Sequence, residues 1–345
     1  MREKAEYQKK VTVIMKKRNN FFKFGYWIFA CAILLAGCSK EQGAEERIVV
    51  EGVKMEDEKR EQQETESDKV PSEESTKDTE GDTEDMAVEP EIVHADWSEY
   101  FNGLNGTAVM YDASDKRYTI YNEEPAVDRR SPCSTFKIIS SLTALEHGIL
   151  EPGDSTRKWS GEVFWNKDWN KDIDFSEAFR TSCVWYYRQL IDDIGQDRMK
   201  EELEKLQYGN CDISDWEGRL NPNNNNRALT GFWIEASLLI SPKEQVEVME
   251  RIFGENSEYS EETQNELKQV MLVTEQERTD ISVYGKTGMG KVDGIVVDAW
   301  FTGFAETTEG KLYFCVRLGR TDGMDVSSLL AKEIAIQIVT DYSNL

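Results

Sequence analysis

The stretch Pro132-Cys133-Ser134-Thr135-Phe136-Lys137 places a hydroxyl and an amine three residues apart at the start of a predicted helix. A Ser-Pro pair precedes it as a helix start, and an apolar-periodic run follows as far as His147-Gly148. Residues three apart share a helical face, so Ser134 and Lys137 are expected to point into the same space. The helix N-terminus favours negative charge developing at Ser134 and disfavours the Lys137 ammonium, which leaves a neutral amine as a base. The pattern predicts a serine nucleophile, although so short a motif also recurs by chance.

A second motif, Lys286-Thr287-Gly288, lies far downstream at the end of a predicted strand and before a tight exit at Met289-Gly290. On an edge strand a small residue lets the backbone approach a ligand, the Thr287 hydroxyl can bind a carboxylate, and Lys286 supplies positive charge. Lys-Thr-Gly alone is also typical of a strand entering a turn. Together with a helix-opening Ser-x-x-Lys in this order, it indicates a site for an anionic substrate.

Residues 1–38 have the composition of a secretory signal. Lys16-Lys17-Arg18 is a basic stretch, Phe24–Leu34 an apolar core that is too short for a stable membrane span, and Leu35-Ala36-Gly37-Cys38 a small-residue cleavage site. The final cysteine makes the segment resemble a bacterial lipoprotein signal, which implies lipidation of Cys38 and attachment to the extracytoplasmic face of a bacterial cell membrane. A plain signal peptide with an incidental cysteine is the alternative. Met1 and Met15 are both candidate starts.

Residues 39–95 are expected to be an acidic, disordered tether, and residues 96–345 the folded catalytic domain. Positions 39 to 91 hold 20 Asp or Glu and 7 Lys or Arg, so they bury too little apolar surface to offset their chain entropy. The remainder is long enough for a sizeable core. The net charge of the chain, −25, disfavours binding to nucleic acid or direct binding to an anionic membrane. Membrane contact is therefore expected through lipid on Cys38 only.

Histidine and cysteine are scarce, which limits the chemistry. The chain has two histidines, so a Ser-His-Asp triad and a histidine-ligated zinc site both lack residues, and no metal site is predicted. The four cysteines beyond the leader can form two bridges or stay free. Cys133 and Cys183, each beside a serine of interest, are interpreted as small core residues. The other two are Cys211 and Cys315.

The order of elements predicts an α/β fold of the α+β type, with an antiparallel sheet flanked by helices and a helical subdomain inserted between its strands. Alternating apolar runs and turn residues mark the strands, and caps such as Ser241-Pro242 mark helix starts. The expected strands are 106–111, 117–121, 283–287, 299–305 and 312–318, and the expected helices are 131–147, 175–194, 242–253 and 327–342.

Four motifs in order make the chain resemble the class D serine β-lactamases and the related β-lactam-sensing receptor domains. The Ser-Thr-Phe-Lys motif is followed by Ser182-Cys183-Val184, Tyr208-Gly209-Asn210 and Lys286-Thr287-Gly288. Secondary matches are Trp169-Asn170-Lys171-Asp172 and Phe232-Trp233-Ile234-Glu235. The resemblance covers residues 96–345 and implies a serine β-lactamase/transpeptidase-like fold that hydrolyses the amide of penicillin-type β-lactams.

The resemblance also implies roles for single residues. Ser134 would form the acyl-enzyme, Lys137 would be the general base as a CO2-derived carbamate (N6-carboxylysine), and Ser182 would relay a proton. No other cofactor is implied, and the Tyr-Gly-Asn motif is expected to be partly structural. Backbone N–H groups of Ser134 and Met289 would form the oxyanion hole. The carbamate would be supported by Val184 and Trp233, and the substrate would be bound by Lys286, Thr287, Gly288 and Met289.

Two departures from the family pattern leave questions open. The proline that the family usually places shortly after the Ser-Thr-Phe-Lys motif is replaced by Ile138-Ile139 leading directly to Ser140. Asp325-Val326-Ser327 occupies the region where many members place a carboxylate-binding arginine, for which Arg320 is a candidate substitute. The substrate range and the oligomeric state therefore stay open. The alternative functions are a β-lactam sensor and a penicillin-binding transpeptidase-like protein, both of which acylate but deacylate slowly. The lack of an H-E-x-x-H protease motif disfavours a sensor.

Overall fold

The computed structural model describes residues 89–220, 225–273 and 281–343, all within one compact unit, Asp82–Leu345. The leader, Cys38 and most of the expected tether lie outside the described residues. No helix in the described part of the chain is long and apolar enough to cross a bilayer.

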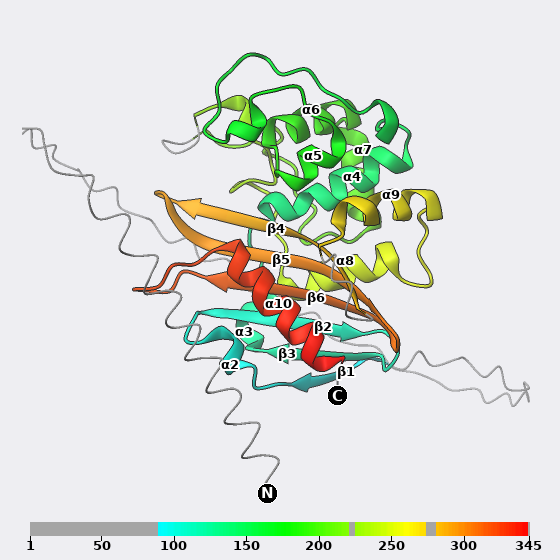
Figure 1. The fold of residues 1–345 in the computed structure, drawn as a ribbon, viewed down its shortest axis with the longest axis vertical. Coiled ribbons are helices and arrows are strands. Elements are labelled where there is room, and N and C mark those ends of the chain that lie inside the picture. Colours follow the sequence, from blue (N-terminus) through cyan, green and yellow to red (C-terminus); the bar gives the residue numbers. More distant parts are fainter. Residues whose placement is uncertain (1–88, 221–224, 274–280, 344–345) are drawn as a thin grey trace, which may run out of the picture. The chain divides into compact units, whose positions relative to one another are not determined.

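A six-stranded sheet forms the middle layer, in the order β1-β3-β2-β6-β5-β4 (Figure 1). All neighbouring strands pair antiparallel except β1 and β3, which pair parallel. The strand β4, which carries Lys286-Thr287-Gly288, is therefore an edge strand. The strands are β1 Glu91–His94, β2 Gly106–Asp112, β3 Arg117–Tyr121, β4 Ser282–Val292, β5 Ile295–Thr307 and β6 Gly310–Gly319.

Helices cover both faces of the sheet. The longest, α10, lies across β4, β5 and β6, and α4 to α7 gather beyond the β4 edge (Figure 1). The α-helices are α2 Ser98–Phe101, α3 Glu123–Val127, α4 Lys137–Glu146, α5 Phe175–Arg180, α6 Val184–Ile194, α7 Gln196–Lys205, α8 Pro242–Phe253, α9 Glu261–Met271 and α10 Ser328–Tyr342. The 3₁₀ turns are η1 Cys133–Phe136, η2 Pro152–Asp154, η3 Lys167–Trp169 and η4 Arg227–Leu229.

Alternation along β5 divides the interior into two cores. Trp300 and Phe304 point to the core shared with the inserted helices, whereas Phe301 points to a second core beneath α10. The prediction of an antiparallel sheet flanked by helices, with a helical insertion, is confirmed. The hairpin at 106–121 is also confirmed, and so is the capping box in which Ser241 and Glu244 open α8.

Backbone conformation accounts for two corrections to the predicted helices. The helix predicted over 175–194 is two helices, α5 and α6, because Ser182 between them has a positive φ of 58°. The nucleophile segment begins as the 3₁₀ turn η1, in which Cys133 has φ 49°, and becomes α-helical at Lys137.

The folded part begins earlier in the chain than the sequence predicts. Strand β1 lies within the segment 39–95 that was expected to be tether, so the last residues of that segment belong to the sheet. Its side chains are exposed, and it is held by backbone pairing with β3 rather than by burial, which apolar patterning cannot detect.

The cysteines Cys133, Cys183, Cys211 and Cys315 are all free thiols, which excludes the bridged alternative for them in this structure.

Candidate active site

The turn that carries Ser134 is fixed by the loop after η4. The backbone N–H of Cys133 donates to the carbonyl oxygen of Trp233 at 2.9 Å, and the Ser131 hydroxyl donates to the same oxygen at 3.0 Å. These two bonds hold the residues on either side of Pro132. Ser134, next in the chain, remains partly exposed and so accessible to a ligand.

Ser134 and Lys137 come together as their spacing predicts. The Lys137 Nζ lies 3.1 Å from the Ser134 Oγ, within hydrogen-bond range. The Lys137 side chain is 1% exposed, and burial lowers its pKa to about 8 because desolvation disfavours the charged form. No carboxylate among the described residues forms an ion pair with this amine. In its neutral form it can accept the proton of the serine hydroxyl.

One aromatic ring lies close to the Lys137 amine, and the two residues expected to line it lie on segments next to this region. The Lys137 Nζ lies 5.1 Å from the centre of the Tyr187 ring, one turn into α6, and Val184 is the first residue of that helix. Trp233 is fully buried, and its ring centre is 6.1 Å from that of Phe136. The Arg188 guanidinium carbon also lies 5.7 Å from the centre of the Trp233 ring.

A second lysine, Lys286 on β4, is also buried in this site. It is 5% exposed, and its Nζ contacts the carbonyl oxygen and the hydroxyl of Thr287 at 3.2 and 3.3 Å. Burial lowers its pKa to about 7, and the positive charges of Lys137 and Lys332 lower it further in the same direction. A group that is buried beside other cations and has no anionic partner is suited to attract an anionic ligand.

Strand β4 presents alternate backbone groups to the nucleophile turn. Near one end of its free edge, the Val283 carbonyl accepts from the N–H of Val273, and near the other the N–H of Lys291 donates to Glu235. Backbone direction alternates along a strand, so Thr287 and Met289 present their N–H groups on this same free edge. The N–H of Met289 is therefore available on the edge where an oxyanion donor is expected.

Gly288 explains why this strand can lie so close to the nucleophile. A Cβ at this position would be 2.9 Å from the Pro132 carbonyl oxygen and 2.9 Å from the Thr135 methyl carbon. Any larger residue would push β4 away from η1. The third residue of Lys-Thr-Gly is thus required for close packing of the two motifs.

Ser182 lies at the junction of α5 and α6, and residues on either side of it, Phe179 and Cys183, interact with the two lysines. The neighbouring Cys183 thiol has a pKa raised to about 11 by burial, and the charge of Lys137 acts on it in the opposite direction. At the end of α5, the Phe179 ring centre is 5.7 Å from the Lys286 Nζ. Among the described residues, the Ser182 hydroxyl forms no hydrogen bond with Ser134 or Lys137.

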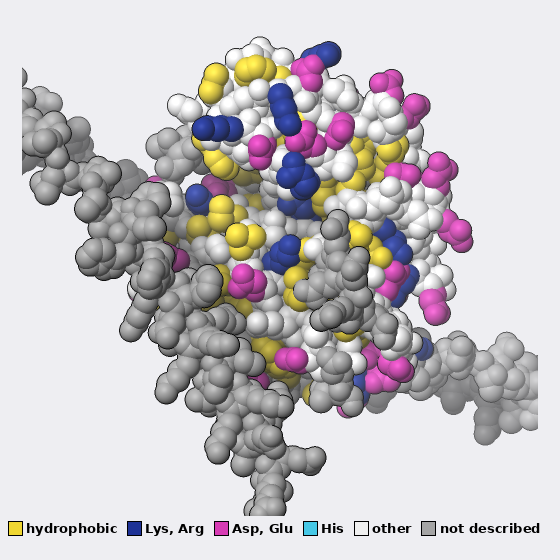
Figure 2. Space-filling view, in the orientation of Figure 1, with side chains coloured by type: hydrophobic (Ala, Val, Ile, Leu, Met, Phe, Trp, Pro, Cys, Tyr) yellow, Lys and Arg dark blue, Asp and Glu magenta, His cyan; other side chains and the backbone are white. Residues whose placement is uncertain are grey.

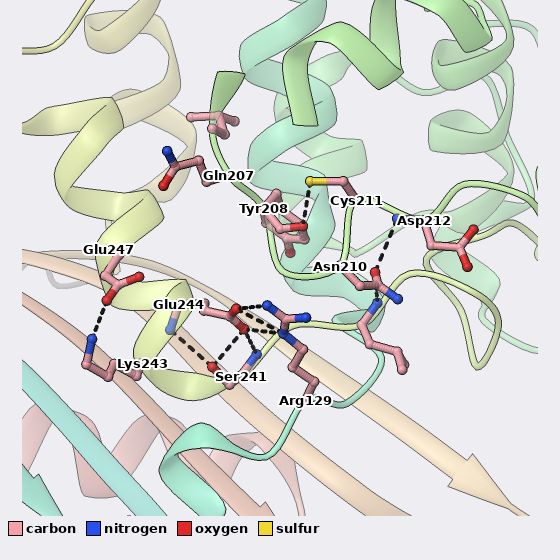
Figure 3. A network of polar contacts seen from close by, with 12 residues as sticks. Arg129, Gln207, Tyr208, Asn210, Cys211, Asp212, Ser241, Lys243, Glu244 and Glu247 are labelled. Atoms are coloured by element: carbon pink, nitrogen blue, oxygen red, sulfur yellow. Dashed lines mark hydrogen bonds and ion pairs between the residues drawn. The ribbon is translucent and has the colours of Figure 1, made fainter. Parts of the chain in front are cut away.

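The Tyr-Gly-Asn segment has a structural role (Figure 3). The Asn210 side chain donates to the Ser237 carbonyl oxygen at 2.8 Å and accepts from the Leu239 N–H at 2.9 Å. Gly209 has φ 55°, and a Cβ there would lie 2.0 Å from the Leu239 oxygen. This segment fixes the course of the chain after the Trp233 loop and contributes no polar group to Ser134.

Arg320, the candidate substitute for the family arginine, forms an ion pair with a neighbouring carboxylate. Arg320 is exposed, and its Nε is 3.3 Å from an Asp322 carboxylate oxygen. Lys332 on α10 is half-buried, and its charge acts on Lys286. No motif marks Lys332 in the sequence. Its position depends on how α10 packs, and Figure 2 shows several Lys and Arg side chains on this face between the inserted helices and α10.

Comparison with known proteins identifies the family. The family model of the penicillin binding protein transpeptidase domain matches residues 106–340, and the chain belongs to this family. Within it, the chain is homologous to class D β-lactamases and to the sensor domain of the regulatory protein BlaR1.

Two relatives show the range of this similarity. The regulatory protein BlaR1 of Bacillus licheniformis is 31% identical over 250 residues, which are 72% of this chain but 39% of that protein. The probable β-lactamase YbxI of Bacillus subtilis is 31% identical over 243 residues, 70% of this chain and 82% of that protein. This chain thus matches well under half of the length of the regulatory protein.

Solved structures agree with the sequence relatives. The C-terminal domain of the Bacillus licheniformis BlaR penicillin-receptor superposes with a TM-score of 0.63 at 30% identity, covering 73% of this chain and 97% of that domain. A class D β-lactamase from Bacillus subtilis superposes with a TM-score of 0.62 at 30% identity, covering 72% of this chain and 95% of that protein.

Proposed function

We propose that the chain is a class D serine β-lactamase that hydrolyses the amide of penicillin-type antibiotics through an acyl-enzyme on Ser134. The observation that carries the proposal is the 3.1 Å separation between the Ser134 Oγ and the amine of Lys137, which is buried and has a pKa lowered to about 8. Because its pKa is lowered, a larger fraction of this amine is neutral, and only the neutral form can accept the proton of the adjacent Ser134 hydroxyl.

The acylation step is assigned to several residues, of which Ser134 and Lys137 are within hydrogen-bond range of each other. Lys137 removes the proton of Ser134 as its oxygen attacks the lactam carbonyl carbon. The N–H groups of Ser134 and Met289 stabilise the negative charge that develops on the carbonyl oxygen. Ser182 relays the Ser134 proton from Lys137 to the ring nitrogen as the C–N bond breaks, which leaves the acyl group on Ser134 and returns both relay groups to their starting states. Lys286 and Thr287, with Lys332 behind them, attract the substrate carboxylate.

The surroundings of Lys137 fit a carbon-dioxide adduct on its amine. The neutral amine that such an adduct requires is favoured by burial, and the resemblance to class D β-lactamases assigns the Trp233 indole N–H as the donor to the adduct. When formed, the adduct supplies an anionic base that persists after acylation. Val184 and Trp233 would hold it by excluding water and by donating one hydrogen bond.

A sensor is the second candidate, because the BlaR1 relative and the YbxI relative are equally similar to this chain. Both candidates acylate at Ser134, and they differ in how long the acyl group remains.

Covalent labelling tests the shared step. The full chain, incubated with a fluorescent penicillin and then denatured, should retain one fluorophore per molecule, and the Ser134→Ala variant should retain none. A peptide map should place the label on the fragment that contains Ser134. Labelling of Ser134→Ala at full stoichiometry would exclude Ser134 as the nucleophile.

A further inference from the structure

Glu235 forms hydrogen bonds with two segments of the candidate site. Its carboxylate Oε1 accepts from the backbone N–H of Lys291 at 2.6 Å, just beyond the Lys-Thr-Gly motif on β4. Its own backbone N–H donates to the Ser131 hydroxyl at 2.9 Å. Glu235 is partly buried and has φ 50°, a conformation uncommon for glutamate, so the local chain is held in place by these contacts.

The Ser131 hydroxyl continues this connection to the nucleophile. It donates to the Trp233 carbonyl oxygen, which also accepts from the N–H of Cys133, the residue before Ser134. An unbroken series of hydrogen bonds thus leads from Lys291 on β4 through Glu235 to the turn that carries Ser134. The same series holds the Trp233 loop, whose indole ring packs against Phe136, the residue before Lys137.

The bond to Lys291 matters because β4 is an edge strand. The described part of the chain provides no further strand beyond β4, and the register between β4 and β5 shifts between Gly290 and Lys291. This end of the strand therefore has a weakened ladder on one side and only Glu235 on the other. A hydrogen bond to a carboxylate is among the stronger kinds, and here it restrains the strand two residues from the N–H of Met289.

We propose that Glu235 is a positioning residue that sets the distance between the free edge of β4, and so the Met289 N–H, and the Ser134 hydroxyl during acylation. This inference rests on the proposed function, because it concerns the acylation step. Glu235 touches no reacting atom. Its effect is exerted through two backbone segments, and a displacement of about 1 Å in such a group can lower a rate by about 100-fold.

The experiment separates substrate binding from acylation. Rapid mixing of the full chain with a fluorescent penicillin gives a dissociation constant for the first complex and a rate constant for acylation. In Glu235→Ala the acylation rate constant should fall about 100-fold, as for loss of one oxyanion donor, while the dissociation constant changes within about two-fold. In Glu235→Gln the amide oxygen can still accept from Lys291, so acylation should recover to within about five-fold of wild type.

Two further variants complete the test. Glu201→Ala removes an exposed glutamate from α7, away from the site, and should match wild type in both constants. Glu235→Asp keeps the charge but shortens the side chain, so it should slow acylation even if Glu235→Ala does not fold. Hydrogen exchange at the Lys291 amide should accelerate in Glu235→Ala and Glu235→Asp but not in Glu235→Gln.

The failures of the two proposals are distinguishable. If wild type is not labelled at all, the proposed function is wrong and this inference falls with it. If wild type is labelled and the Ala and Asp variants acylate at its rate, the inference alone is overturned. An equal loss in the Gln and Ala variants would also overturn it, because a position that tolerates only glutamate is not acting as a hydrogen-bond acceptor.

Discussion

Lys137 is buried and has no carboxylate partner among the residues that the structure describes, and this environment determines its protonation state. Desolvation lowers its pKa to about 8, so about a tenth of the molecules carry a neutral amine at pH 7 and most do at pH 9. The nearby Lys286 is buried in the same way, with a pKa lowered to about 7. The lowered pKa values mean that each lysine is more often neutral than a lysine in water. A neutral amine at Lys137 is the form that can act as a base or react with carbon dioxide.

The pKa of Lys137 predicts a pH dependence for carbon-dioxide binding. With dissolved carbon dioxide held constant through a fixed gas phase, the fraction of Lys137 that carries an adduct should rise as pH increases through about 8, because only the neutral amine reacts. Carbon-13 NMR of the full chain under labelled carbon dioxide measures this directly, without substrate. The adduct signal should be absent in Lys137→Met.

Trp233 provides the matched test of how the adduct is held. Trp233→Phe keeps an aromatic ring in the wall but removes the indole N–H, so the same NMR titration should require about ten-fold more carbon dioxide for equal occupancy. An adduct signal that does not change with pH, or that persists in Lys137→Met, would contradict the assignment of Lys137.

Among single residues, the sequence predicted the Ser134–Lys137 pair well, because residues three apart on a helical turn lie close together independently of the rest of the fold. The role of Glu235 was not predicted, since it depends on contact with Lys291, which is distant in the sequence. Lys332 was missed for the same reason. Local spacing determines local pairs, whereas contacts between a loop and a sheet edge depend on the whole fold.

Helix α10 packs against β4 and carries Lys332, whose charge acts on Lys286, and this leads to a prediction about the carboxylate anchor. Lys332→Ala should lower the second-order acylation constant for benzylpenicillin about ten-fold, the cost of losing a hydrogen bond or ion pair to a charged group. The methyl ester of benzylpenicillin has no carboxylate, so its constant should be unchanged by the same substitution. Competition with a fluorescent penicillin measures both.

Arg320→Ala is the control for that experiment. Arg320 is exposed and paired with Asp322, so its removal should leave both constants near wild type. Equal losses for the acid and the ester in Lys332→Ala would show a structural effect rather than carboxylate binding. A selective loss in Arg320→Ala would instead make Arg320 the anchor.

Apolar periodicity predicted most of the helices and strands, but it did not predict where a helix is interrupted. The sheet strands and α8 follow from alternation and caps, whereas the break between α5 and α6 depends on a left-handed Ser182, which no pattern signals. That break places the Ser-x-Val motif between two helices. Strand β1 was missed because it is short and exposed, and only its pairing partner identifies it as a strand.

For the whole molecule, the sequence predicts a folded domain attached through an acidic segment to a lipid on Cys38. Wild type expressed in a bacterial host should sediment with membranes and enter the detergent phase, and Cys38→Ala should be released to the soluble fraction or remain unprocessed. The reason is that the lipid supplies apolar contact that the acidic chain does not. Equal distribution of the two proteins between fractions would show that the cysteine is incidental.

The lifetime of the acyl group on Ser134 separates a hydrolase from a sensor, and nitrocefin turnover by the purified full chain measures it most directly. In bicarbonate-containing buffer, we expect the absorbance change to continue far past one equivalent of nitrocefin per protein molecule, and to be absent in Ser134→Ala. A single burst that stops at one equivalent, with the acyl group still attached to Ser134 hours later, would contradict the β-lactamase proposal and identify a penicillin receptor.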